Sequence, residues 1–118
     1  MDKLKVLFHV NEIEKWSAAL GNITNLIMDV GIDAVDVVLI ANGQGVNAYA
    51  DGEKVAEMTK LAEQGIQFLA CSNSLKMMCS QGAVCMRPES LPYFVKVVPA
   101  GITFIIRTQQ NGFAYVKP

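Results

Sequence analysis

The stretch that decides the fold class runs from Val35 to Gly45 and reads VDVVLIANGQG. Its first seven residues are almost continuously apolar, which is typical of a central parallel strand covered on both faces. The glycine-rich tetrapeptide NGQG that follows predicts a tight turn at the carboxyl end of this strand. Because parallel strands need crossover connections, the flanking sequence should supply helices.

The rest of the chain supplies alternating strands and helices. Apolar and β-branched residues predict strands over 4–10, 66–71, 95–98 and 113–116. Apolar residues at three- and four-residue spacing predict helices over 12–30, 51–64 and 72–81. Segment 101–110 has strong β propensity, but its apolar spacing also fits a helix, which the alternation of elements requires. The order predicts a single domain over residues 1–118, an α/β fold forming a three-layer α/β/α sandwich on a mainly parallel five-stranded sheet.

The first predicted helix carries signals at both ends. Asn11, with Glu14 three residues later, predicts a capping box at its start. Gly31 predicts a left-handed residue just beyond its end. Its apolar face is wider than one contact with a sheet usually needs, which indicates that part of it packs against another subunit.

Composition excludes several classes of protein. Hydrophobic residues make up 52% of the 118 residues, which is ample to offset the entropy of ordering and excludes a disordered chain. Ten basic and eleven acidic residues give a net charge of −1, so neither nucleic acid nor an anionic membrane surface is expected as a partner. No apolar stretch approaches the roughly 20 residues of a membrane helix. The charged share of only 18% again favours a homo-oligomer.

The cysteines indicate a reducing compartment. Residues 1–5 lead directly into a strand-like segment without the apolar region of a signal peptide, so a cytoplasmic location is expected. The three cysteines are an odd number and are therefore expected to be reduced thiols. Their spacing, with one histidine, fits no zinc pattern, so no metal is expected.

Ligands of parallel sheets bind beyond the carboxyl ends of the strands. This rule selects the residues that end each strand or follow it, and these form the candidate pocket: His9, Asn11, Asn42, Gly43, Gln44, Gly45, Cys71, Ser72, Asn73, Ser74 and Gly101.

Cys71 is the principal candidate for chemistry. It ends a predicted strand and precedes a predicted helix, so backbone N–H groups at the helix start would favour its thiolate. A thiolate at this position is a nucleophile or a sulfur carrier and needs no metal. The alternative is a small apolar residue that closes a buried strand.

The other titratable candidates have weaker patterns. His9 is either an acid–base group that could orient Cys71 from the adjacent strand, or a histidine satisfied within the core. Cys79 shares a helical stripe with Leu75, which predicts core packing. Cys85 lies in a loop-like segment and is predicted to be exposed, as a resolving thiol would be.

Segment 43–48 reads GQGVNA and matches one form of the dinucleotide-binding fingerprint. It follows the second predicted strand rather than the first, and so short a chain lacks the two halves of a dinucleotide site. A tight turn that brings the backbone close to the cleft is the better interpretation. No organic cofactor is expected.

The chain resembles the DsrE/DsrF-like family of small sulfur-relay proteins over essentially its whole length. The resemblance lies in the order and spacing of segments 8–12 (FHVNE), 19–23 (ALGNI), 25–26 (NL), 38–43 (VLIANG), 65–75 (GIQFLACSNSL), 98–102 (VPAGI) and 109–118 (QQNGFAYVKP). It implies a five-stranded α/β/α fold, assembly into trimers or hexamers, and a persulfide-carrying cysteine after the third strand. Only Cys71 occupies that cysteine position, and Asn42 stands where many relatives have a histidine.

Three functional hypotheses follow. The leading one is a cytoplasmic sulfur-relay protein that carries sulfane sulfur as a persulfide on Cys71 and passes it to an acceptor thiol, with His9 shaping the pocket. Such a protein would be a persulfide transferase, and Lys76 or Arg87 would help to bind an anionic donor. The second is a non-enzymatic, oligomeric module that binds a small ligand and has a structural Cys71. The third is a redox sensor that pairs Cys71 with Cys79 or Cys85.

Overall fold

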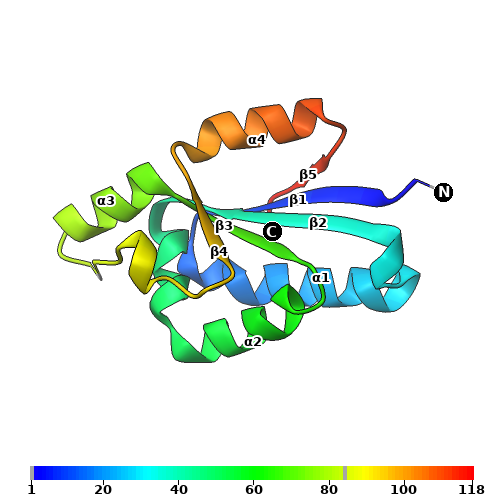
Figure 1. Cartoon of the computed structure of the whole chain (residues 1–118), viewed down its shortest axis with the longest axis horizontal. Helices are drawn as coiled ribbons and strands as arrows, with labels where there is room; N and C mark the ends of the chain where they lie inside the picture. The colour runs from blue at the N-terminus through cyan, green and yellow to red at the C-terminus, as the bar shows by residue number, and fades with distance from the viewer. Residues whose placement is uncertain (1, 84) are drawn as a thin grey trace.

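The computed structural model describes residues 2–83 and 85–118 and shows a five-stranded sheet with helices on both faces (Figure 1). All pairs of neighbouring strands are parallel, and the sheet order is β4-β3-β2-β1-β5. The strands are β1 (Leu4–Val10), β2 (Val35–Ala41), β3 (Gln67–Cys71), β4 (Val95–Val98) and β5 (Ala114–Val116). The predicted α/β fold is therefore confirmed, with β2 as the central strand.

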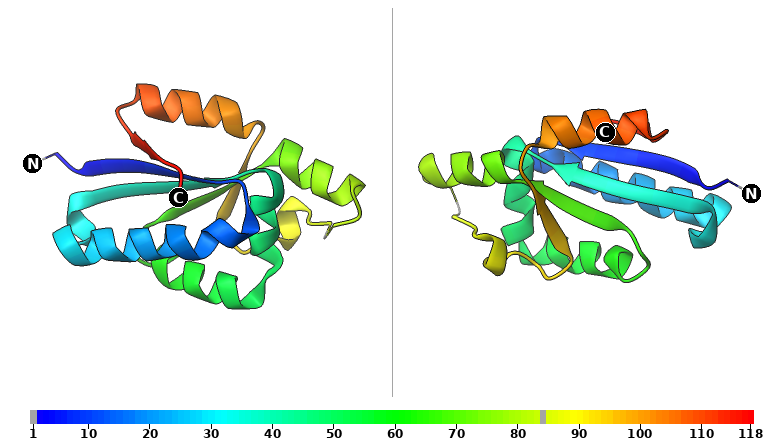
Figure 2. Two further views of the ribbon diagram at one scale, coloured as in Figure 1. Left: turned by 180° about the vertical axis from the view of Figure 1, so that it is seen from behind. Right: turned by 45° about the horizontal axis from the view of Figure 1, so that its top comes forward.

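Four α-helices connect these strands. They are α1 (Trp16–Val30), α2 (Gly52–Ala62), α3 (Ser72–Ser80) and α4 (Gly101–Gln110). Helices α1 and α2 lie on one face of the sheet, and α4 lies on the other (Figures 1 and 2). Helix α3 follows β3 directly and projects beyond the carboxyl edge of the sheet. Segment 101–110 is a helix despite its β-branched residues, because Ile105 is buried against the sheet while the opposite side of α4 is exposed.

Short 3₁₀ helices fill four of the connections: η1 (Ile13–Lys15), η2 (Ile32–Ala34), η3 (Gly43–Ala50) and η4 (Pro88–Ser90). The predicted turn over 42–45 is present, closed by a hydrogen bond of 3.0 Å from the N–H of Gly45 to the carbonyl of Asn42, but it continues as the eight-residue helix η3, which was not predicted. The capping box at Asn11 is wrong: Glu12 is the N-cap of η1, no side chain caps it, and α1 begins only at Trp16. Gly31 does end α1, with a φ of 89° and its N–H donated to the carbonyl of Ile27.

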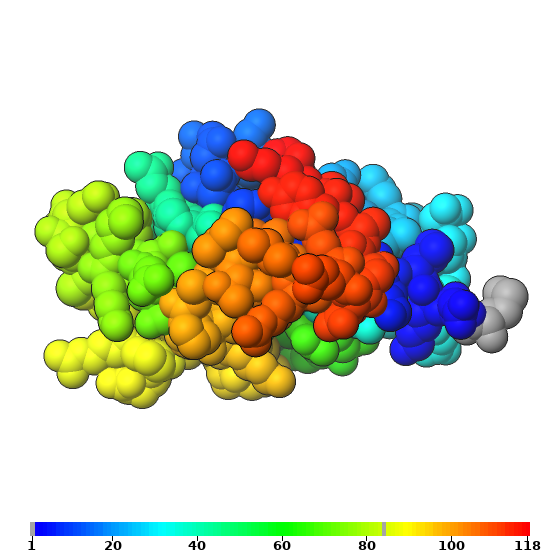
Figure 3. Space-filling model, turned by 90° about the horizontal axis from the view of Figure 1, so that it is seen from above, coloured from blue at the N-terminus to red at the C-terminus, as the bar shows by residue number. Residues whose placement is uncertain are grey.

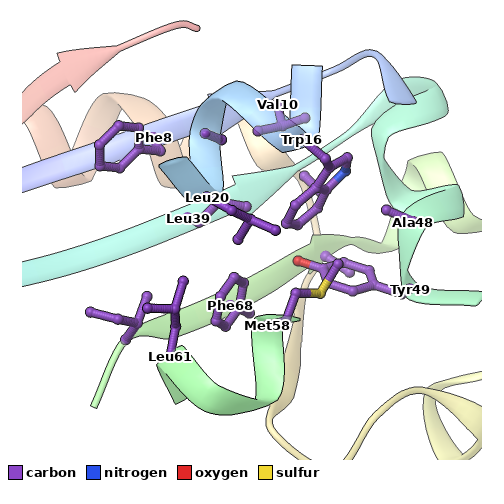
Figure 4. Close-up of a cluster of buried hydrophobic side chains, with 14 of the residues drawn as sticks. Phe8, Val10, Trp16, Leu20, Leu39, Ala48, Tyr49, Met58, Leu61 and Phe68 are labelled. Carbon is purple, nitrogen blue, oxygen red and sulfur yellow. The ribbon is translucent and has the colours of Figure 1, made fainter. Parts of the chain in front are cut away.

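The larger core lies between the sheet and the α1–α2 layer (Figure 4). Its centre is aromatic, with the Trp16 ring centroid 5.4 Å from that of Tyr49 and 6.3 Å from that of Phe68. The polar atoms of these buried rings are paired. The indole N–H of Trp16 donates to the carbonyl of Gly45, and the hydroxyl of Tyr49 donates to the carbonyl of Leu69, each across 2.8 Å. The rings therefore anchor η3 as well as filling the core.

A close approach of two backbones places the loop after β2. A Cβ atom on Gly45 would lie 2.3 Å from the carbonyl oxygen of Val10, so only glycine fits without a shift of the chain. The N–H of Asn42 donates to the same carbonyl across 3.1 Å. These contacts hold Asn42 and Gly43 at the carboxyl edge of the sheet.

The opposite face of the sheet has a smaller core, formed by Leu7, Val38, Ile40, Leu69 and Ile105. Figure 3 shows α4 lying across this face, with the residues of β5 beside it. No helix among the described residues is both long enough and apolar enough to cross a membrane.

Candidate functional site

Cys71 lies where strand β3 becomes helix α3. It is the last residue of β3 and the N-cap of α3, with extended backbone angles. Its thiol is free, and only 5% of the residue is exposed. The backbone N–H groups of Asn73 and Ser74, at the start of α3, lie near the sulfur and lower the pKa of the thiol. Cys71 thus faces the positive end of a helix, as predicted.

The start of a second helix meets the same sulfur. Cys71 pairs with Val98 in the β3–β4 register, so the chain that leaves β4 passes beside Cys71 before it enters α4. There the N–H of Gly101 donates to Sγ of Cys71 across 3.3 Å. Two helix N-termini therefore point their unpaired N–H groups at one sulfur atom.

Ser74 adds a side-chain donor. Its hydroxyl oxygen accepts a hydrogen bond of 2.8 Å from the N–H of Gly43. The hydroxyl hydrogen is consequently available to Cys71, and the Ser74 side chain lowers the pKa of that thiol. The loop after β2 thus orients a donor on α3 toward the thiol.

These contacts set the protonation of Cys71. Burial raises the pKa of its thiol and is the largest single influence. The Ser74 hydroxyl and the N–H groups of Ser74, Gly101 and Asn73 act in the opposite direction, and together they prevail. The pKa of Cys71 therefore lies below its ordinary value, so the thiolate is favoured. Because the thiolate is the reactive form of cysteine, the site is suited to nucleophilic sulfur chemistry.

His9 belongs to the same edge but does not lie beside Cys71. Strand β2 separates β1 from β3, so the prediction that His9 lies on the strand adjacent to Cys71 is wrong. The Nε2 atom of His9 is hydrogen-bonded to Oδ1 of Asn42 across 2.8 Å, and its Nδ1 atom to the hydroxyl of Tyr115. The alternative, a histidine satisfied within the core, fits only in part. Both ring nitrogens are hydrogen-bonded to side chains, but the residue is only half-buried.

Tyr115 is a site residue that the sequence reasoning missed. It lies on β5, opposite Leu7 in the parallel register, and shares a face of the sheet with His9. Strand alternation could have placed it on that face, but the pairing of β5 with β1 was needed to bring it to His9.

The structure gathers some of the predicted pocket residues and not others. Those with contacts around Cys71 are Asn42, Gly43, Asn73, Ser74 and Gly101. Asn11 lies beside Gly43, and its buried Oδ1 atom has no hydrogen-bond partner among the described residues. Gly45 is buried against the carbonyl of Val10, and its own carbonyl accepts from Trp16. Gln44 is exposed. Ser72 is half-buried at the start of α3.

The other two cysteines differ from their predictions. Cys79 and Cys85 form a disulfide, so the expectation of three reduced thiols is wrong for this pair. Cys79 is exposed on α3, which contradicts the predicted core packing, whereas Cys85 is exposed as predicted. The sensor hypothesis paired Cys71 with one of them, but the structure joins them to each other and leaves Cys71 free.

Among the described residues, neither Lys76 nor Arg87 is one of the groups that shift the pKa of Cys71. Lys76 and Arg87 are both exposed, and the backbone of Arg87 is held by Ser90 in the loop before β4. Within residues 2–83 and 85–118, no group of three or more His, Cys, Asp or Glu side chains could hold a metal ion. The segment that matches the dinucleotide fingerprint lies in η3, and the N–H of Gly43 is already donated to Ser74.

Comparison with solved structures identifies a close relative of the whole chain. The protein MTH1491 from Methanobacterium thermoautotrophicum, a protein of unknown function, superposes with a TM-score of 0.82 at 33% sequence identity. The match covers 96% of this chain and 97% of MTH1491. No family model and no curated protein matches the chain. At this identity and coverage, the chain belongs to the same family as MTH1491.

Proposed function

We propose that the protein is a DsrE-like sulfur-relay protein that carries sulfane sulfur as a persulfide on Cys71 and passes it to an acceptor thiol. The observation that carries this proposal is the set of hydrogen-bond donors around the free thiol of Cys71, which come from two helix starts and from Ser74. They favour a thiolate, which sulfur transfer requires. The order and spacing of segments that resemble DsrE/DsrF-like proteins support the same function.

The proposed reaction consists of two exchanges. The Cys71 thiolate attacks the outer sulfur of a donor persulfide, R–S–SH, so that a new S–S bond forms to Sγ while the donor S–S bond breaks and R–S⁻ leaves. An acceptor thiolate then attacks the outer sulfur on Cys71 and releases the Cys71 thiolate. No net oxidation occurs, so the cycle needs neither a redox cofactor nor a metal.

The low exposure of Cys71 defines which reagents can reach it. Only 5% of the residue is accessible in the single chain, so little of its surface is open to a reacting sulfur. This geometry favours an extended, slender persulfide over a bulky disulfide. It also protects a bound persulfide from water and from random thiols.

We also propose that the protein acts in the cytoplasm as a homotrimer or homohexamer. The support is on α4, where Ile102 is 63% exposed and Ile106 is 49% exposed in the single chain. Exposed apolar residues on neighbouring turns of one helix are typical of a subunit contact. Light scattering should give the mass of three or six chains, and Ile106→Lys should reduce it. Tyr93→Lys, at an exposed loop residue, is the matched control. A monomeric wild-type protein would contradict this part of the proposal.

Intact-mass spectrometry tests the relay. The oxidised protein has one free thiol, so exposure to glutathione persulfide should add one sulfur atom to the wild type and none to Cys71→Ser. The double variant Cys79→Ser, Cys85→Ser should still accept one sulfur atom, which reductant then removes. If no donor gives a Cys71-dependent adduct, the sulfur-relay proposal is wrong.

One observation favours the second candidate, a small-ligand-binding module. A cavity of about 480 Å³ lies along α4, lined by residues that include Val98, Pro99, Phe104 and Arg107 but not Cys71. If the protein is a module of this kind, the variant Cys71→Ser should bind the ligand as well as the wild type does. A thermal-shift screen of wild type and Cys71→Ser with small organic anions separates the two functions, because only the module predicts the same stabilisation of both.

A further inference from the structure

The side chain of Asn42 has its two polar ends in different surroundings. Its oxygen Oδ1 is held by Nε2 of His9 across 2.8 Å. Its nitrogen Nδ2 lies 3.6 Å from the point that a Cβ atom on Gly101 would occupy. Within the part of the chain that the structure describes, Nδ2 has no hydrogen-bond acceptor. One end of the amide is therefore fixed, and the other end is a free donor beside Gly101.

The hydrogen bonds of His9 have a defined order of donors and acceptors, from Tyr115 through His9 to Asn42. Because Asn42 presents an oxygen, Nε2 of His9 has to carry the hydrogen. In the neutral ring, Nδ1 then accepts from the Tyr115 hydroxyl. Burial raises the pKa of Tyr115, so its hydroxyl keeps its proton at neutral pH. Protonation of His9 would also leave the Nε2–H bond in place, so the Asn42 amide stays oriented in either state.

Gly101 leaves open the space between Asn42 and Cys71. A Cβ atom on Gly101 would lie 3.4 Å from Cβ of Cys71 and 3.5 Å from Cβ of Asn42. The open side of Gly101 is thus bordered by both residues. A persulfide extends the cysteine side chain by one S–S bond of about 2 Å. The donors of Ser74 and Gly101 act on Sγ itself. The outer sulfur of a persulfide would therefore require a different hydrogen-bond donor.

We propose that Tyr115 and His9 are positioning residues that orient the Asn42 amide so that Nδ2 donates a hydrogen bond to the outer sulfur of a Cys71 persulfide. This inference rests on the proposed sulfur relay and names the residue that recognises the transferred atom. The deprotonated persulfide carries its charge on the outer sulfur, so a donor there stabilises the loaded protein. The free thiolate of Cys71 has its own donors and gains little from Asn42.

The variant Asn42→Ala tests this division of roles with two measurements. The first is the pH profile of Cys71 alkylation, which should remain that of the wild type because the donors to Sγ are intact. The second is the half-life of the Cys71 persulfide after the donor is removed, which should fall about tenfold or more for the loss of a hydrogen bond to a charged group. A purely structural role of Asn42 would change both quantities.

Two variants of His9 separate positioning from acid–base catalysis and do not depend on how well Asn42→Ala folds. His9→Gln can place an N–H near the position of Nε2 and should keep most of the persulfide lifetime, whereas the shorter His9→Asn should lose it. An acid–base role predicts that both are equally impaired, because neither amide titrates. Tyr115→Phe should shorten the lifetime less than His9→Asn does.

The outcomes distinguish this inference from the function on which it rests. If the wild type takes up no sulfur, both proposals are wrong. If the wild type is loaded and Asn42→Ala keeps the wild-type lifetime, or if His9→Gln and His9→Asn are equally impaired, only the role of the Tyr115–His9–Asn42 chain is overturned.

Discussion

The backbone N–H of Gly101 donates a hydrogen bond to Sγ of Cys71 across 3.3 Å, although the two residues are 30 positions apart. This bond exists because β3 and β4 are neighbours in the sheet and Cys71 pairs with Val98. The start of α4 is thereby brought to the start of α3. A thiol at the end of one strand thus receives donors from two helices.

Removing the Ser74 hydroxyl should make Cys71 less acidic. The pKa of Cys71 is lowered in part by the side chain and N–H of Ser74, so Ser74→Ala should raise it. Since the thiolate is the form that reacts, the midpoint of the alkylation profile should move to higher pH and the rate at neutral pH should fall several-fold. Iodoacetamide labelling followed by intact mass measures both. Ser72→Ala, two residues earlier on α3, is the matched control and should leave the profile unchanged.

Filling the space beside Gly101 should block loading without harming the fold. In Gly101→Ala the new methyl group meets Cys71 and Asn42 at 3.4 Å or more, which is ordinary contact, and alanine favours the helix. The free energy of unfolding should therefore change by less than about 1 kcal/mol. Persulfide uptake should fall strongly, because the methyl group occupies the space that borders Cys71. Uptake equal to that of the wild type would contradict the position assigned to the outer sulfur.

Glycine at position 45 should be needed for stability. A Cβ atom there would lie 2.3 Å from the carbonyl oxygen of Val10, which is backbone and cannot move aside. Gly45→Ala should therefore destabilise the protein by about 1–3 kcal/mol, as overpacking does. Gly21→Ala is the matched control: Gly21 is exposed on α1 with no atom within 4 Å of the new methyl group, so it should stabilise by up to about 1 kcal/mol. Urea denaturation measures both, and equal effects would contradict the steric argument.

The disulfide should stabilise the protein without changing the pKa of Cys71. It closes a short loop between Cys79 and Cys85, near the end of α3 that is remote from Cys71. The double variant Cys79→Ser, Cys85→Ser should lose about 2 kcal/mol, the loop-entropy value for so short a ring. Its Cys71 alkylation profile should match that of the oxidised wild type. A shifted profile would show that the disulfide acts on the site.

The strands and helices were predictable because their signals are local. The apolar run of β2 and the three- and four-residue spacing of α1 do not depend on distant partners, and α4 was assigned correctly from the alternation of elements. The start of α1 was mispredicted, and the continuation of the turn at 42–45 into the helix η3 was not predicted. In both cases a contact between distant residues decides the outcome, since Gly45 packs against Val10 and accepts from Trp16.

The candidate site was predictable in part. The rule that ligands bind at the carboxyl edge of parallel strands selected Cys71, Asn42 and Gly101 before their contacts were known. The exposure of Cys79 and its disulfide with Cys85 were not predicted. The helical spacing of Cys79 identifies a face of α3 but does not show what covers that face.

By itself, the sequence determined the class of fold, the central strand and the edge at which chemistry is concentrated, because hydrophobic periodicity and strand direction are properties of short segments. Only the tertiary structure decided that Gly101 and Ser74 serve the sulfur of Cys71, and that Tyr115 reaches His9, which holds Asn42. Those contacts depend on the sheet order β4-β3-β2-β1-β5 and on its register. Order and register arise from the packing of the whole chain, so no single segment encodes them.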